Sequence, residues 1–143
     1  MRVYLAARYS RIAELNGYAD ELRRRGHDIT ARWLQGGHQL TAGELSDEAA
    51  HEKRTQFAEE DYADLLAAEC VISFSETPRQ PSTSRGGRHV EFGIALEAKK
   101  RCILIGPREN VFHCIPWVEW YPTWADYLAA DDAAQRARER LLS

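Results

Sequence analysis

The stretch RGGRHVEFGIAL, residues 85–96, lies between two short apolar runs, CVISF at 70–74 and CILI at 102–105. An apolar run, a glycine-containing loop, a helical pattern and a second apolar run are typical of a βαβ unit. Two adjacent glycines at the start of a helix let a ligand approach the backbone, and the free N–H groups there favour an anion. The stretch therefore predicts a parallel sheet with a ligand site where this helix begins.

Glu91 is the unusual residue of this helix, because it shares a face with the apolar residues Ile94, Ala95 and Ala98. A glutamate in the first turn often does no more than complement the helix dipole. Alternatively, its carboxylate points into the crevice at the carboxyl ends of the strands, where open α/β sheets bind ligands. Position alone leaves both interpretations open.

Length and composition restrict the class of protein. The chain has 143 residues, 44% of them hydrophobic and 29% charged, and a formal net charge of −3. These values predict one globular domain over residues 1–143, and the lack of a basic excess argues against a nucleic-acid polymer as partner. No apolar stretch reaches the length of a membrane span, and no signal-peptide pattern is present. We therefore expect a cytoplasmic protein with no membrane partner.

The sequence shows no pattern for a metal ion or a cofactor. Its cysteines, Cys70, Cys102 and Cys114, fit no zinc motif, and its five histidines are scattered. We expect free thiols in a reducing compartment. The turn at residues 6–10 lacks the Gly-x-Gly-x-x-Gly pattern, and no P-loop lysine is present. We therefore expect neither NAD nor ATP, and no other cofactor.

The remaining chain alternates between strand and helix patterns. Strands are expected at residues 2–7, 27–34, 70–74, 101–105 and 117–121. Helices are expected at about 11–25 and 47–68, from the glycine pair at 86–87 through Lys99, and at 124–142. Ser10 and Thr123 are candidate N-caps of the first and last helices. This alternation predicts a doubly wound, mostly parallel, flavodoxin-like (Rossmann-like) sheet of about five strands.

A second carboxylate lies on the apolar face of the helix expected at 47–68. Asp61 shares that face with Phe57, Leu65 and Ala68, and Asp64 lies there too. A lone carboxylate in such a position is usually a boundary residue. It becomes a candidate for catalysis only if Glu91 is near.

Three segments resemble the nucleoside 2-deoxyribosyltransferase family and the related nucleotide N-glycosidases: VYLAA at 3–7, DYADL at 61–65 and GRHVEFGIAL at 87–96. The last segment is the most specific, because the family places its nucleophilic glutamate before Gly-x-Ala at the start of this helix. The resemblance implies that Glu91 is the nucleophile, that Tyr4 positions it and that Asp61 handles the leaving base. It also implies a homodimer or a higher homo-oligomer.

The chain departs from the transferases before the nucleophile. Their aspartate in that loop has no clear counterpart among residues 82–85, whereas the nucleotide-acting relatives place a serine there to bind the 5′-phosphate. The C-terminal residues that the transferases borrow from a neighbouring subunit have no confident match either. These differences weigh more against transfer between free nucleosides than against glycosidic chemistry.

Polar residues around the glycine pair are candidates for a 5′-phosphate site, since arginines and hydroxyl groups beside a helix N-terminus suit a phosphate. These residues are Ser82, Ser84, Arg85, Gly87 and Arg88. The alternative is a solvated loop.

Residues after the first strand are candidates for contact with the base or sugar across the crevice; they are Ala6, Arg8 and Tyr9. Trp33 is either a base-stacking residue or a core or interface tryptophan. The aromatic cluster at residues 117–124 favours core and dimer contacts over ligand binding.

Together these residues predict hydrolysis of the N-glycosidic bond of a (deoxy)ribonucleoside 5′-monophosphate by a retaining mechanism, with release of the free base. Breaking this bond develops positive charge at C1′, which a carboxylate can stabilise or attack, while a second group protonates the base. One alternative is base exchange between nucleosides by a nucleoside 2-deoxyribosyltransferase. Others are a nucleotide-binding module without turnover and a purely structural flavodoxin-like protein.

Overall fold

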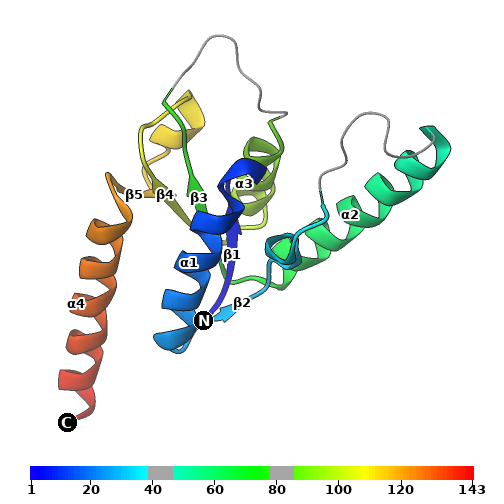
Figure 1. The fold of residues 1–143 in the computed structure, drawn as a ribbon. Helices are drawn as coiled ribbons and strands as arrows, with labels where there is room; N and C mark the ends of the chain where they lie inside the picture. Colours follow the sequence, from blue (N-terminus) through cyan, green and yellow to red (C-terminus); the bar gives the residue numbers. More distant parts are fainter. Residues whose placement is uncertain (39–46, 78–85) are drawn as a thin grey trace.

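Parallel strands form the central layer of the computed structural model, which describes residues 1–38, 47–77 and 86–143 (Figure 1). The strands in these residues are β1 (Arg2–Ala6), β2 (Asp28–Ile29), β3 (Cys70–Phe74), β4 (Arg101–Ile105) and β5 (Glu119–Tyr121). The helices are α1 (Ile12–Arg24), α2 (Asp47–Ala67), α3 (Gly87–Glu97) and α4 (Trp124–Leu142). Short 3₁₀ helices are η1 (Tyr9–Arg11), η2 (Arg32–Gln35) and η3 (Val111–Cys114).

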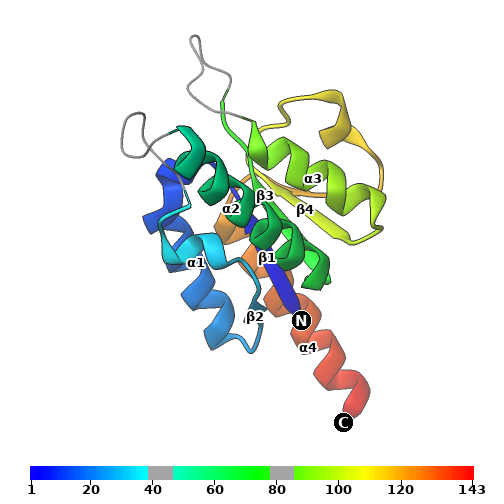
Figure 2. The same ribbon diagram turned by 90° about the vertical axis from the view of Figure 1, so that its right-hand side faces the viewer.

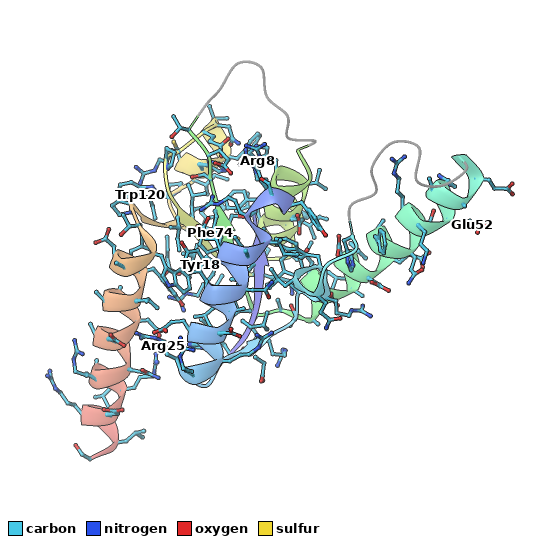
Figure 3. The ribbon with its side chains drawn as sticks, in the orientation of Figure 1. Arg8, Tyr18, Arg25, Glu52, Phe74 and Trp120 are labelled. Atoms are coloured by element: carbon cyan, nitrogen blue, oxygen red, sulfur yellow. The ribbon has the colours of Figure 1, made fainter. Side chains whose placement is uncertain are left out.

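The sheet has the order β2-β1-β3-β4-β5, and every neighbouring pair is parallel. This is the flavodoxin-like order, which confirms the predicted fold class. Figure 2 shows α2 and α3 side by side over one face of the sheet. On the other face, Tyr18 of α1 stacks on Phe74 of β3, with ring centroids 5.2 Å apart, and on Trp124 of α4, with centroids 4.5 Å apart. Figure 3 labels Tyr18 and Phe74 on this side of the sheet.

The core lies along the two central strands. All five residues of β3 are buried, and Val3, Leu5 and Ile72 are fully inaccessible to solvent. Burial of each such side chain stabilises the fold by about 1.5–3 kcal/mol. A rigid core of this kind fixes the carboxyl ends of the strands, where the candidate site lies.

The predicted strand over residues 27–34 is wrong in its second half. β2 pairs only Asp28 and Ile29 with β1, after which the chain turns into η2. Where a longer strand would have continued the ladder, the carbonyl of Leu5 accepts a hydrogen bond of 2.8 Å from the indole Nε1 of Trp33. A side chain thus satisfies this backbone group, which leaves the chain free to bend away from the sheet.

The predicted helix ends are partly correct. Thr123 caps α4 as expected, because its hydroxyl accepts the N–H of Asp126 at 3.2 Å. Ser10 does not cap α1: it lies inside η1, and α1 begins after Arg11 without a side-chain cap. None of the described helices is both long and apolar enough to cross a membrane.

Candidate functional site

Tyr4, Asp61 and Glu91 come from β1, α2 and α3, and the structure brings them together on the α2–α3 side of the sheet. After burial, the charge of Glu91 and then that of Asp61 are the main causes that raise the pKa of the Tyr4 hydroxyl far above its usual range. The charge of Asp61 also raises the pKa of Glu91. Interactions of this kind require the three groups to be close neighbours.

Glu91 is half-buried in α3, where Phe92 and Ala95 pack into the core and Val90 faces solvent. This helix begins after Gly86, whose left-handed backbone (φ 80°) suits glycine and turns the chain into α3. Burial raises the pKa of Glu91 to about 7, and the nearby Tyr4 hydroxyl partly opposes this rise. The carboxyl group is therefore poised between its two protonation states near neutral pH.

The Tyr4 hydroxyl is buried and makes no hydrogen bond of ordinary geometry within the described part of the chain. It lies close enough to Glu91 to stabilise the carboxylate, although not in a fully formed hydrogen bond. A buried hydroxyl without a structural partner is a group available to a reacting neighbour.

Asp61 lies in α2, near Tyr4 and Glu91. Burial raises its pKa to about 6, while its Oδ1 atom is buried and has no hydrogen-bond partner among residues 1–38, 47–77 and 86–143. Two neighbouring carboxyl groups with raised pKa values titrate as a pair. Such a pair can hold one proton near neutral pH, so that one group is an acid and the other a carboxylate.

Arg88 is buried, and its charge is already balanced inside the protein. Both terminal nitrogens of its guanidinium contact the Glu109 carboxylate, with Nη2 2.9 Å from Oε2. Glu109 also accepts the backbone N–H of Glu76 at 2.7 Å. Arg88 lines a shallow depression at the ends of β3 and β4, together with other described residues that include Ser73 and His113, and this depression has no room for an enclosed water molecule.

The other predicted phosphate-site residues are mostly outside the described chain. Ser82, Ser84 and Arg85 all lie there, whereas Gly87 is the exposed first residue of α3. Arg8 immediately precedes η1, and Figure 3 shows it at the end of the molecule where α3 begins.

The remaining predicted contact residues lie at or near the end of β1. Ala6 is its buried last residue. Tyr9 in η1 accepts the N–H of Gly37 through its hydroxyl at 3.0 Å, and its ring centroid is 6.1 Å from that of Trp33. Trp33 itself is only 5% exposed and belongs to the core.

Sequence reasoning missed His38 as a neighbour of Asp61. Its Nε2 lies 3.6 Å from Asp61 Oδ1 and 3.1 Å from Glu60 Oε2. The only signal in the sequence is the preceding pair Gly36-Gly37, and both glycines adopt positive φ (93° and 84°). Within the described residues, no group of three or more His, Cys, Asp or Glu side chains could hold a metal ion.

No protein-family model and no curated protein matches this sequence. Solved structures do match the fold. A 2-deoxyribosyltransferase from Bacillus psychrosaccharolyticus superposes with a TM-score of 0.66 at 16% identity, over 89% of this chain and 90% of that one. The CMP N-glycosidase of Clostridium botulinum superposes with a TM-score of 0.56 at 22% identity, over 93% of this chain and 99% of that one.

A conserved protein from Enterococcus faecalis V583 superposes with a TM-score of 0.50 at 17% identity, over 73% of this chain and 62% of that one. Identities this low establish a shared fold. The chain therefore has the single-domain, flavodoxin-like α/β fold of the solved 2-deoxyribosyltransferase and CMP N-glycosidase, as its resemblance to these families implied.

Proposed function

We propose that the protein hydrolyses the N-glycosidic bond of a (deoxy)ribonucleoside 5′-monophosphate by a retaining mechanism and releases the free base. The observation that carries this proposal is the pair of carboxyl groups, Glu91 and Asp61, with raised pKa values beside the Tyr4 hydroxyl. The names of two solved structures of this fold, a 2-deoxyribosyltransferase and a CMP N-glycosidase, agree with this class of reaction.

The first step forms a glycosyl-enzyme. A carboxylate oxygen of Glu91 attacks C1′, and the electron pair of the C1′–N bond leaves with the base while Asp61 donates its proton to the base. In the second step Asp61 takes a proton from water, whose oxygen attacks C1′ and displaces Glu91. Two inversions give net retention, and Asp61 ends the cycle protonated again.

The substrate itself directs the shared proton to the correct carboxyl group. Burial raises the pKa of Glu91 to about 7 and the pKa of Asp61 to about 6. Positive charge that develops at C1′ favours the carboxylate form of the adjacent Glu91, and so does the Tyr4 hydroxyl. The proton is therefore driven to Asp61, where the departing base needs it.

Transfer to a second base is the second candidate. The same glycosyl-enzyme would be released by a nitrogen of another base in place of water, as in a nucleoside 2-deoxyribosyltransferase. The superposition on the Bacillus psychrosaccharolyticus enzyme favours this candidate. Access of water to the glycosyl-enzyme distinguishes the two reactions.

A chromatographic assay for free base tests the proposal. Its substrates are nucleosides and the matching 5′-monophosphates, in ribo and deoxyribo form, each incubated with and without a second free base. We expect free base and sugar phosphate from a monophosphate, and at least a 1,000-fold loss with Glu91→Gln, on the order expected for a nucleophile. Glu97→Gln, an exposed change on the same helix, is the matched control. A new nucleoside formed only with added base would establish transfer instead, and ligand binding without base release would establish a binding module.

A further inference from the structure

His38 follows η2 and reaches over α2. Its ring lies against Phe57 with the centroids 4.4 Å apart, and its side chain is only 10% exposed. Nε2 lies 3.1 Å from Glu60 Oε2 and 3.6 Å from Asp61 Oδ1, while Nδ1 lies 3.5 Å from the carbonyl oxygen of Gly36. The imidazole is therefore held between the backbone of its own loop and two carboxylates of α2.

Both ring nitrogens of His38 face oxygen acceptors, so each N–H of the protonated ring has a partner. Asp61 Oδ1 has no hydrogen bond within the described ranges and is buried, which is an unfavourable position for a lone carboxylate oxygen. Burial raises the pKa of Asp61, and two cations oppose this rise. His38 lowers the pKa of Asp61 more than Arg32 does. When protonated, the imidazole is thus the stronger of these two sources of opposite charge for this carboxyl group.

The loop that carries His38 is tied down independently of His38. Asp64 accepts the backbone N–H of Arg32 at 2.8 Å and its Nε at 2.9 Å. Asn16 donates to the Leu34 carbonyl at 2.9 Å, and the Gly37 N–H donates to the Tyr9 hydroxyl. These bonds fix the position of the imidazole before any ligand arrives, as a precise site requires.

We propose that His38 is a positioning residue for Asp61: just after η2, it places its imidazole 3.6 Å from Asp61 Oδ1 and, when protonated, supplies the opposite charge that influences the protonation of this carboxyl group. The proposal rests on the proposed function, in which Asp61 protonates the leaving base. The other charged or titratable groups facing Asp61 and His38 are Glu60 and Asp64 on α2, Arg32 on η2, Glu91 on α3 and Tyr4 on β1.

The sign of the effect follows from the charge. An imidazolium beside Asp61 favours the carboxylate, so removal of the imidazole favours the protonated acid and raises the pH at which Asp61 loses its proton. A step that needs protonated Asp61 slows as the pH rises through that value. In His38→Gln we therefore expect the alkaline limb of the kcat profile to move to higher pH by about 0.5–1 pH unit. This shift is smaller than a nearby charge often causes, because His38 and Asp61 are partly exposed to solvent.

The decisive measurement is the carboxyl ¹³C titration of Asp61 in protein labelled at aspartate, with the signal assigned through Asp61→Asn. We expect the Asp61 midpoint to rise by about 0.5–1 pH unit in both His38→Gln and His38→Asn. His51→Gln is the matched control, because His51 is an exposed histidine of the same helix α2. It should leave the midpoint unchanged.

An unchanged Asp61 midpoint in both folded His38 variants would overturn the proposal, and so would an equal shift in His51→Gln. We use both His38→Gln and His38→Asn because one of them could fail to fold. Thermal unfolding shows whether each variant is folded. The titration needs no turnover. If no nucleotide is cleaved but the midpoint still shifts, the proposed reaction fails while the coupling of His38 to Asp61 stands.

Discussion

Arg88 and Glu109 form a two-point ion pair that ties the first turn of α3 to the segment after β4. Their side chains are only 9% and 11% exposed. Burial works against the charge of Glu109, but hydrogen bonds from Arg88 and the Glu76 N–H hold its pKa below the usual range. The pair thereby anchors the helix that carries Glu91, three residues after Arg88.

Loss of one partner of this ion pair should destabilise the protein strongly. Arg88→Met leaves the Glu109 carboxylate buried without its cation, and we expect a loss of about 3 kcal/mol or more in the free energy of unfolding. The double variant Arg88→Met with Glu109→Gln should recover part of the loss, because no unpaired charge remains. Urea unfolding of the single and double variants measures both effects. A loss below about 1 kcal/mol in Arg88→Met would contradict the burial of this pair.

The stability of the protein should depend on pH through Glu91. Burial raises the pKa of Glu91 from its ordinary 4.5 to about 7, so between these values the folded protein holds a proton that the unfolded chain releases. The contribution of Glu91 to the free energy of unfolding therefore falls as the pH rises from about 4.5 to about 7. In Glu91→Gln that decline is absent.

Above about pH 7 we expect Glu91→Gln to be more stable than the wild type by an amount on the order of 2 kcal/mol, and equally stable near pH 4. Urea unfolding at a series of pH values measures the difference, with Glu97→Gln as the exposed control on α3. If the free energy of unfolding depends on pH in the same way in the wild type and in Glu91→Gln, Glu91 is solvated like an ordinary glutamate.

Tyr4→Phe should impair Glu91 without harming the fold. The Tyr4 hydroxyl favours the carboxylate form of Glu91, so its removal should move the titration of Glu91 to higher pH. We expect base release near pH 7 to slow by about 10-fold or more through kcat, since the nucleophile is less ionised and less well held. Stability should change by less than about 1 kcal/mol, because the hydroxyl makes no regular hydrogen bond in the described structure.

Tyr127→Phe provides a matched control for this change. Tyr127 in α4 also has a buried hydroxyl without a partner among the described residues, but it packs on the opposite face of the sheet beside Trp124. It should leave both kcat and the Glu91 titration unaltered. Equal effects of the two substitutions would assign the loss to packing.

Asp64→Ala should loosen η2, which begins at Arg32. Asp64 is 7% exposed and accepts the backbone N–H and the Nε of Arg32. Its loss leaves a backbone donor unsatisfied, so we expect about 2 kcal/mol of destabilisation and faster hydrogen exchange at the Arg32 amide. Asp64→Asn, which keeps an acceptor for that N–H, should show a smaller effect. Exchange that is equally slow in Asp64→Ala would mean that other contacts hold the start of η2.

Local signals account for the parts of the fold that were predicted correctly. The apolar runs of β1, β3 and β4 and the capped helix α4 were recognisable because hydrophobic period and capping act over a few residues. The candidates Tyr4, Asp61 and Glu91 came from helix-face positions and from a family resemblance. No local rule indicates that the chain would leave β2 after Ile29, since that depends on how the Leu5 carbonyl is satisfied.

By itself, the sequence determined a parallel α/β sheet, and it singled out one carboxylate at the start of α3 and another on α2. Only the tertiary structure decided that Trp33 belongs to the core, that the charge of Arg88 is taken up by Glu109 and that His38 stands beside Asp61. Each of these outcomes pairs a buried polar group with a partner more than 20 residues away. Such pairings are selected by the need to satisfy charge and hydrogen bonds once water is excluded, and that need arises only when the chain has folded.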